Sequence, residues 1–154
     1  MKVWVDVKAK KVFADPQAQG TVTLLRELGI VVESVETAAL YLLEGDVSKA
    51  DAQKVARELL TDPVTQDCQV HLEGSNDDAP AKGGITLDVW LKPNVTDPVA
   101  PSVERGARDL GVALKARVGQ RYVLKGSLDA EAAVKAAWRA LANPVMHTVE
   151  ARAG

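Results

Sequence analysis

Two related copies of one segment make up most of the chain, and this duplication restricts the fold more than any other feature. Sliding the sequence by 82 residues aligns the first parts of the copies, which share these identities: Asp6 with Asp88, Val7 with Val89, Lys10 with Lys92, Asp15 with Asp97, Pro16 with Pro98, Leu28 with Leu110, Gly29 with Gly111. Sliding by 81 aligns the remaining parts: Tyr41 with Tyr122, Leu43 with Leu124, Gly45 with Gly126, Ala52 with Ala133, Lys54 with Lys135, Ala56 with Ala137, Leu60 with Leu141, Pro63 with Pro144, Val64 with Val145. A one-residue deletion after Gly111 accounts for the change of offset.

The copies are separated by GSNDDAPAKGG, residues 74–84, which has turn-forming residues and no apolar periodicity. Such a composition is typical of a flexible connector, and extended it spans about 30 Å. We therefore expect a first repeat at 1–73, a linker at 74–84 and a second repeat at 85–154. The linker is long enough for the two repeats to pack side by side.

Each repeat begins with alternating apolar and polar residues, VWVDVK at 3–8 and ITLDVWLK at 85–92. Alternation with β-branched residues predicts a strand that is covered on one face. An Asp-Pro pair then predicts a helix start, and Gly29 or Gly111 predicts its end in a left-handed conformation. The apolar residues expected on the inner face of this helix are Ala18, Val22, Leu25 and Leu28, or Val99, Val103, Ala107 and Leu110.

The second part of each repeat predicts two neighbouring strands and another helix. The strand pairs are IVVESVE with AALYLLEG, and VALKARV with RYVLKG. The helix begins at Ser48 or Asp129 and stops before Pro63 or Pro144, because proline lacks an amide hydrogen and disfavours helical geometry in the preceding residue. A final strand follows. Each repeat is thus predicted to be β-α-β-β-α-β, an α+β unit with an antiparallel sheet and both helices on one face, and the two units are pseudo-twofold related.

Trp4 and Trp90 are predicted on the sheet face opposite the helices, which has no obvious cover within one repeat. A large apolar side chain there indicates a contact surface, either between the repeats or with a partner. The alternative is a partly exposed tryptophan lying beside long side chains. Under the contact hypothesis, replacing either residue by alanine weakens association more than folding.

The charge and composition exclude several classes. The formal net charge is −2 and no block of one sign occurs, which argues against general nucleic-acid binding. Cys68 is the single cysteine, so no internal disulfide can form. No apolar stretch has the length of a signal peptide or a membrane span. We expect a cytoplasmic protein.

A search of the sequence for catalytic, cofactor and metal motifs finds no self-sufficient site. His71 and His147 have no metal-binding spacing and are expected on solvated strand ends. Cys68 is expected to be a small strand residue. No glycine-rich phosphate loop or calcium loop occurs, so no cofactor or metal is predicted. RVGQR, residues 117–121, is predicted to be a strand turn whose two arginines suit an anion or an acidic partner surface.

The second repeat resembles the PurS-type small subunit of phosphoribosylformylglycinamidine synthase along nearly its whole length. The segment LKPNVTDPVAPSVERGARDLGV (91–112) resembles that family's LKPxVxDPxG start, and ARVGQRYVL resembles its R-x-G-K strand turn, with Gln120 in place of lysine. LANPV (141–145) resembles the family's LxNPV ending. The first repeat is less faithful, because TDPV replaces Asn-Pro-Val and VETAALY lacks the Arg and Gly of the turn.

The resemblance implies a fused pair of subunits that elsewhere form a dimer. It also implies a non-catalytic accessory role in purine biosynthesis, in a complex that converts formylglycinamide ribonucleotide, glutamine and ATP to the amidine. The partners would be the large synthase subunit and the glutaminase subunit, with a part in enclosing the path of ammonia. The expected partner-binding residues are Arg117, Gly119, Gln120, Arg121, Asp97, Pro98, Trp4 and Trp90.

Another class of protein remains open from the sequence. Paired β-α-β-β-α-β units are also typical of ACT-like regulatory modules, which bind small ligands such as amino acids. Stabilisation by a ligand would favour that class, whereas capture of a large ATP-using synthase favours the assembly subunit. The sequence does not specify whether the fused pair forms a further homo-oligomer.

Overall fold

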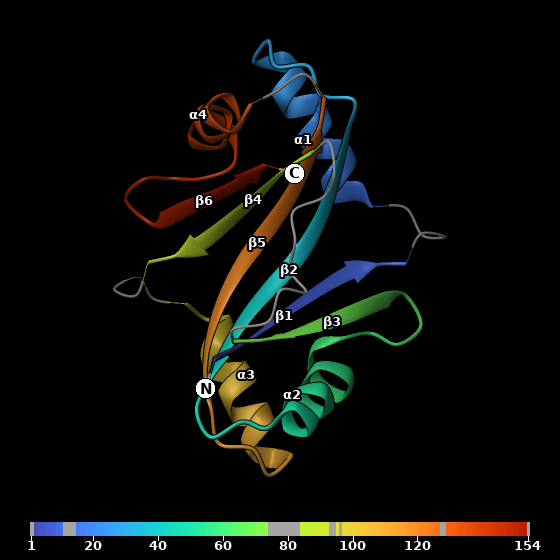
Figure 1. Ribbon diagram of the computed structural model, residues 1–154, viewed down its shortest axis with the longest axis vertical. Helices are drawn as coiled ribbons and strands as arrows, with labels where there is room; N and C mark the ends of the chain where they lie inside the picture. The colour runs from blue at the N-terminus through green and yellow to red at the C-terminus, as the bar shows by residue number, and fades with distance from the viewer. Residues whose placement is uncertain are drawn as a thin grey trace. The chain divides into compact units, whose positions relative to one another are not determined.

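The computed structural model describes residues 2–10, 15–73, 84–92, 95, 97–126 and 129–153. The predicted linker 74–84 lies outside these ranges except for Gly84. The elements, in chain order, are β1 (Lys2–Ala9), α1 (Pro16–Glu27), β2 (Ser34–Glu44), α2 (Lys49–Val55), η1 (Ala56–Leu60), β3 (Gln66–Leu72), β4 (Gly84–Leu91), α3 (Val99–Asp109), β5 (Lys115–Lys125), α4 (Ala130–Ala140) and β6 (His147–Ala153) (Figure 1). The α+β class and the antiparallel sheet are therefore confirmed.

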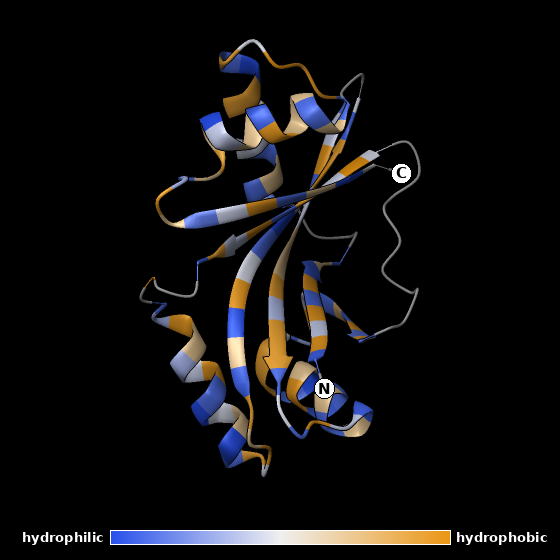
Figure 2. Cartoon of the chain, turned by 60° about the vertical axis from the view of Figure 1, so that its left-hand side comes forward, coloured by the Kyte–Doolittle hydropathy of each residue, from blue (hydrophilic) through white to orange (hydrophobic). Residues whose placement is uncertain are grey.

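The six strands form an antiparallel sheet with the order β3-β1-β2-β5-β4-β6. Equivalent pairs have the same register in both repeats: Trp4 lies opposite His71, and Thr86 lies opposite Arg152. The Glu33 amide donates to the Lys125 carbonyl at 2.7 Å, beside the start of β2 and the end of β5. Along the strands, hydrophobic and hydrophilic residues alternate, as the colour bands of Figure 2 show.

The prediction of two neighbouring strands in the middle of each repeat is wrong. β2 and β5 are each one continuous strand, so a repeat contains three strands. The chain nevertheless divides into two compact units, and the division falls within these strands, after Ala38 in β2 and after Gly119 in β5. The first apolar run of each repeat begins before the strand, at residues 30–33 and 112–114, and continues into it, and this one strand contributes to two hydrophobic cores.

The first unit contains β1, α2, η1 and β3 of the first repeat, together with α3 of the second repeat and the adjoining parts of β2 and β5. Its helices α3 and η1 pack together (Figure 1). Its core combines side chains from both repeats: Val3, Val5, Val7, Leu43, Val47, Ala52, Val55, Ala56, Val103, Ala107, Val112 and Ala116. Full burial of each valine or leucine contributes about 1.5–3 kcal/mol to folding. Without α3, this core would lose Val103 and Ala107 and expose their neighbours.

The second unit contains β4, α4 and β6 of the second repeat, together with α1 of the first repeat and the remaining parts of β2 and β5. Helix α1 packs on α4. The core is again mixed: Ala18, Leu25, Val32, Val35, Ile85, Leu87, Val89, Tyr122, Leu124, Ala133, Ala136 and Ala137. The first helix of each repeat therefore lies in the unit that contains the first and last strands of the other repeat. The repeat boundaries at 73/74 and 84/85 stay a prediction. Each compact unit combines segments from both repeats, so the units do not test where one repeat ends and the next begins.

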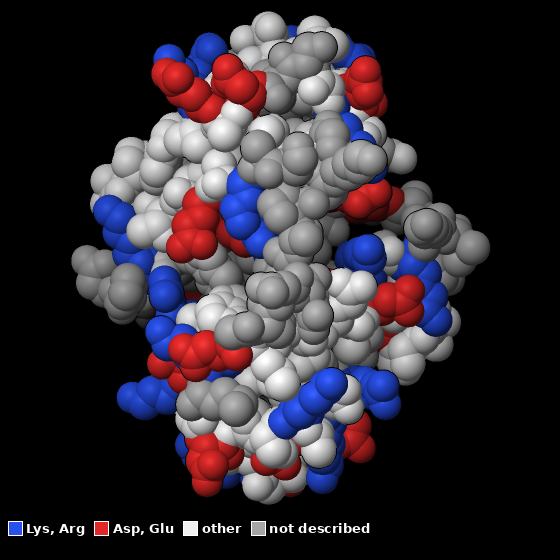
Figure 3. All heavy atoms as spheres, viewed as in Figure 1, with Lys and Arg blue, Asp and Glu red and all other residues white. Residues whose placement is uncertain are grey.

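The predicted helix ends are confirmed. Asp15 Oδ1 accepts from the Ala18 amide at 3.1 Å, and Ser48 with Asp51 forms a capping box. Gly29 and Gly111 follow α1 and α3 with φ of 81° and 85°, a region that only glycine enters without strain. On the face shown in Figure 3, acidic and basic side chains are interspersed.

Candidate partner-binding site

The segment 117–121 does not form the strand turn that the sequence predicted. All five residues lie inside β5, and Gly119 has no positive φ, so the expected tight turn is wrong. Side chains alternate along a strand, so Arg117, Gly119 and Arg121 share one face while Gln120 points to the other. All five are half-buried. The segment also crosses the division between the units, with 117–119 in the first and 120–121 in the second.

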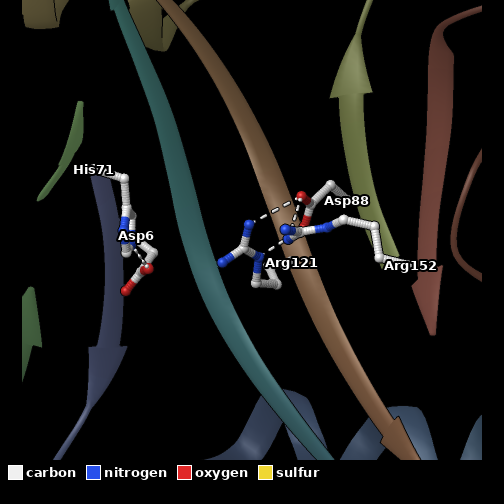
Figure 4. Close-up of polar contacts among 5 residues, drawn as sticks. All are labelled: Asp6, His71, Asp88, Arg121 and Arg152. Atoms are coloured by element: carbon white, nitrogen blue, oxygen red, sulfur yellow. Dashed lines mark hydrogen bonds and ion pairs between the residues drawn. The ribbon is translucent and has the colours of Figure 1, made fainter. Parts of the chain in front are cut away.

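Arg121 binds a buried carboxylate within the second unit. Its Nε donates to Asp88 Oδ1 at 2.7 Å and its Nη2 donates to Asp88 Oδ2 at 3.0 Å, and Arg152 approaches the same Oδ2 at 3.4 Å (Figure 4). The three side chains come from β5, β4 and β6. Only 12% of the Arg121 side chain and 8% of the Asp88 side chain are exposed. A bidentate pair of this kind is strong and geometrically specific, so a principal role of Arg121 is to compensate Asp88.

The first unit has an equivalent acid with a different partner. Asp6 lies 82 residues before Asp88, and its Oδ2 is 2.9 Å from His71 Nε2 (Figure 4). His71 lies 81 residues before Arg152, and Leu40 occupies the position equivalent to Arg121. Asp6 and Leu40 are direct neighbours across β1 and β2. The same buried acid therefore faces a guanidinium pair in one unit, and a histidine and a leucine in the other.

The expectation that His71 lies on a solvated strand end is wrong, because the residue is only 7% exposed. His71 Nε2 and Asp6 Oδ2 share a hydrogen bond whose direction depends on the tautomer of the imidazole ring. Within the described part of the chain, His71 Nδ1 is buried without a hydrogen-bond partner. Sequence reasoning missed the two acid clusters, although a polar residue at the same place in both first strands was an available signal.

Asp97 and Pro98 lie at the start of α3. Asp97 Oδ1 accepts from the Val99 amide at 2.8 Å and from the Ala100 amide at 3.3 Å. Pro98 directly precedes the helix and is exposed. Asp97 holds the helix start as predicted, whereas Pro98 is the N-cap residue and not the first helical residue that the sequence predicted. Their contact with a partner stays a prediction.

The two tryptophans have different environments. Trp90 is 6% exposed, and Thr86 and Asp88 on the same strand face are buried with it. Trp4 is half-buried. The face opposite the helices is therefore not open at Trp90, and an exposed contact patch centred on that residue is excluded. Trp4 keeps some accessible surface and remains a candidate.

A rigid turn with an exposed valine occurs in both units, and sequence reasoning had identified it only as a helix stop. In the first unit, the Val64 amide donates to Asp62 Oδ1 at 2.9 Å, and Lys10 Nζ donates to the Pro63 carbonyl at 2.9 Å. Several hydrogen bonds hold the pKa of the Asp62 carboxyl below its usual value of 3.8, and the bond from the Val64 amide has the largest effect. Yet the Val64 side chain is 70% exposed.

The turn of the second unit repeats this construction. The Val145 amide donates to Asn143 Oδ1 at 2.9 Å, and Lys92 Nζ donates to the Pro144 carbonyl at 2.7 Å. His147 Nδ1 accepts from the Asn143 amide at 2.9 Å, which gives the second histidine a structural role. The Val145 side chain is 75% exposed and Met146 beside it is exposed as well. Each turn pairs an amide with the side chain of its Asp or Asn and its proline carbonyl with a lysine, and it presents an apolar side chain to the surroundings, although Thr61 Oγ1 before the first turn is buried without a partner among the described residues.

Among the described residues, no three His, Cys, Asp or Glu side chains are grouped so that they could hold a metal ion. The described helices include none with the length and apolar character needed to cross a membrane. Burial raises the pKa of Tyr41 and of Tyr122, and both phenols lie against the hydrophobic cores.

Comparison with known protein families matches both repeats separately. The PurS family, described as phosphoribosylformylglycinamidine (FGAM) synthase, matches residues 2–74 and residues 84–153. A search of curated proteins gave no match. The two matched segments together cover almost the whole chain and agree with the duplicated series of identities in the sequence. The chain therefore belongs to the PurS family and contains two PurS units in tandem.

Proposed function

We propose that this chain is the non-catalytic assembly subunit of an FGAM synthase complex in purine biosynthesis, acting in the cytoplasm. In this role it holds a glutaminase subunit and a large ATP-using synthase subunit together, and it helps to enclose the path of ammonia between them. The complex would amidate formylglycinamide ribonucleotide at the expense of glutamine and ATP. The separate match of both repeats to one family is the observation that carries the proposal.

The mixed cores support a scaffold role. Each unit is completed by a helix from the other repeat, so neither repeat by itself contains all the residues of one hydrophobic core. Fusion also keeps the two repeats at an effective concentration in the mM range for a short linker. A scaffold that must hold two different subunits benefits when its own two repeats cannot diffuse apart.

The two valine turns are suited to partner contact. The Val64 and Val145 amides and the proline carbonyls already have hydrogen-bond partners in this chain, so a partner protein would desolvate mainly the apolar side chains of Val64 or Val145. Rigid turns also lose little conformational entropy on binding. Arg117, Gln120, Asp97 and Trp4 remain proposed contacts, whereas Arg121 and Trp90 act first on folding.

Reconstitution tests the proposal. The large synthase and glutaminase subunits encoded by the same genome are mixed with and without this chain, and FGAM formation is followed with glutamine and, separately, with ammonium ions. We expect the chain to be needed for glutamine-dependent activity and to matter much less for ammonium-dependent activity, because free ammonia bypasses transfer between subunits. Equal glutamine-dependent activity without the chain would overturn the proposal. Thermal stabilisation by an amino acid without any subunit binding would favour a ligand-binding regulator instead.

A further inference from the structure

Helix α3 touches η1 at one unusually close point. A Cβ atom added to Gly106 would lie 2.6 Å from Leu59 Cδ1 and 2.9 Å from Leu59 Cδ2, so the end of the Leu59 side chain, which is 37% exposed, would have to move away. Glycine inside a helix is less stable than alanine by about 1 kcal/mol. Gly106 therefore lowers the helix propensity of α3. The space that the Leu59 side chain occupies is a physical reason for a residue without a Cβ atom at this position.

Leu59 lies where the second helix of the first repeat departs from α geometry. Residues Ala56–Leu60 form a π-helical turn after α2, whereas the equivalent helix of the second repeat, α4, stays α-helical from Ala130 to Ala140. π-helical turns are rare and change the direction in which side chains point. The two second helices thus differ in shape over equivalent residues, and in the first unit α3 packs on the π-helical turn.

The second unit reverses the sizes of the two side chains. The residue equivalent to Gly106 is Leu24 on α1, and the residue equivalent to Leu59 is Ala140 on α4. Since α1 packs on α4 and α3 packs on η1, the helix pair of each unit carries one large and one small residue at these equivalent positions. Leu24 and Leu59 are 38% and 37% exposed. The opposite assignment of the helices would combine Leu24 with Leu59 and Gly106 with Ala140, which crowds two large side chains in one unit and leaves the contact between the two small residues less well filled in the other.

We propose that these four residues form a steric code that selects the exchanged helix pairing. Gly106 directs α3 to the first repeat, and Leu24 directs α1 to the second repeat. The partner surface that η1 accepts is the first helix of a second-type repeat, supplied by this chain or by another copy of it. Two first-type repeats cannot pair symmetrically, because Leu24 would meet Leu59. The linker then makes pairing within one chain the favoured outcome.

The first test compares Gly106→Ala with Gly20→Ala in the full chain. Gly20 lies in α1 and has nothing within 4 Å of an added Cβ, so alanine there should raise the Tm by about 2–4 °C through helix propensity. We expect Gly106→Ala to give no such gain, since Leu59 must swing away and lose its contact with α3. In a Leu59→Ala background, both glycine substitutions should raise the Tm alike. Equal gains in the wild-type background would overturn the proposal.

The second test exchanges the sizes of the residues at positions 24 and 106. It covers the case in which the single substitution changes the Tm too little to measure. Leu24→Gly with Gly106→Leu should lower the Tm by about 5 °C or more, because both units then carry the wrong combination. Adding Leu59→Ala and Ala140→Leu restores one large and one small residue in each unit and should recover most of the loss. A quadruple variant no more stable than the double variant would show that the sizes are not coupled, and the code would be wrong.

Discussion

Asp88 and Arg121 form a bidentate ion pair inside the second unit, at 2.7 and 3.0 Å, while their equivalents in the first unit are Asp6 and an uncharged Leu40. The acid is present in both repeats, but it bonds to Arg121 in the second unit and to His71 in the first unit. A buried ion pair is costly to break, because removing one partner leaves the other without compensation in a poorly solvated place.

We expect Arg121→Leu, which copies the residue of the first repeat, to lower the free energy of unfolding by about 3–5 kcal/mol. Asp88→Asn together with Arg121→Leu should cost less than Arg121→Leu alone, since no buried carboxylate is then left with its main partner removed. Urea unfolding measures both variants. Lys135→Ala is the control: its pair with Glu131 is exposed and contributes about 0.5 kcal/mol at most. A cost for Arg121→Leu no larger than that of the control would contradict the assigned role.

Trp90→Ala should act on folding. The side chain is buried, and removing a buried aromatic residue costs about 3–5 kcal/mol. Trp4→Ala should cost clearly less, because part of Trp4 is in contact with water in the folded protein already. Urea unfolding gives both values, and capture of the synthase subunits below the unfolding transition reports association. Similar losses of stability in the two variants would refute the difference in burial.

The turn at Asp62 should respond to protonation of its own carboxylate, whereas the equivalent residue of the second turn, Asn143, has no carboxylate to protonate. The pKa of Asp62 is lowered, chiefly by the Val64 amide, so the ionised form is favoured in the folded turn. Its contribution to stability is present above the ordinary pKa of 3.8 and is lost as the pH falls through the lower folded value. The Val64 amide resonance should therefore titrate with a midpoint below 3.8, whereas the Val145 amide, bonded to the uncharged Asn143, should show no transition with that midpoint and should respond only when His147 Nδ1 is protonated and can no longer accept from the Asn143 amide. A Val64 midpoint at or above 3.8 would disprove the hydrogen bond.

The sequence predicted the local structure well because the signals are local. The Asp15 cap, the Ser48 capping box and the left-handed Gly29 all follow from residues within one turn of each other. The continuity of β2 was missed because strand length depends on which core each end enters, and that is decided by distant residues. Likewise, nothing near Arg121 in the chain indicates Asp88, which is 33 residues away. The exchange of α1 and α3 has no local signal except the sizes of Leu24 and Gly106.

The mixed cores lead to a prediction for the separated repeats. Residues 1–73 alone would lack α3 and therefore leave the core around Val55 without Val103 and Ala107. Residues 85–154 alone would lack α1, which supplies Ala18 and Leu25 to the other core. We expect each fragment by itself to show weak, non-cooperative thermal unfolding by circular dichroism, and an equimolar mixture to regain a cooperative transition. The mixture should melt below the intact chain, by an amount that decreases with concentration, because joining the repeats has become bimolecular. Cooperative unfolding of either fragment alone as a monomer, verified by sedimentation, would mean that a repeat can complete its own core and that the exchange of helices is not needed for folding.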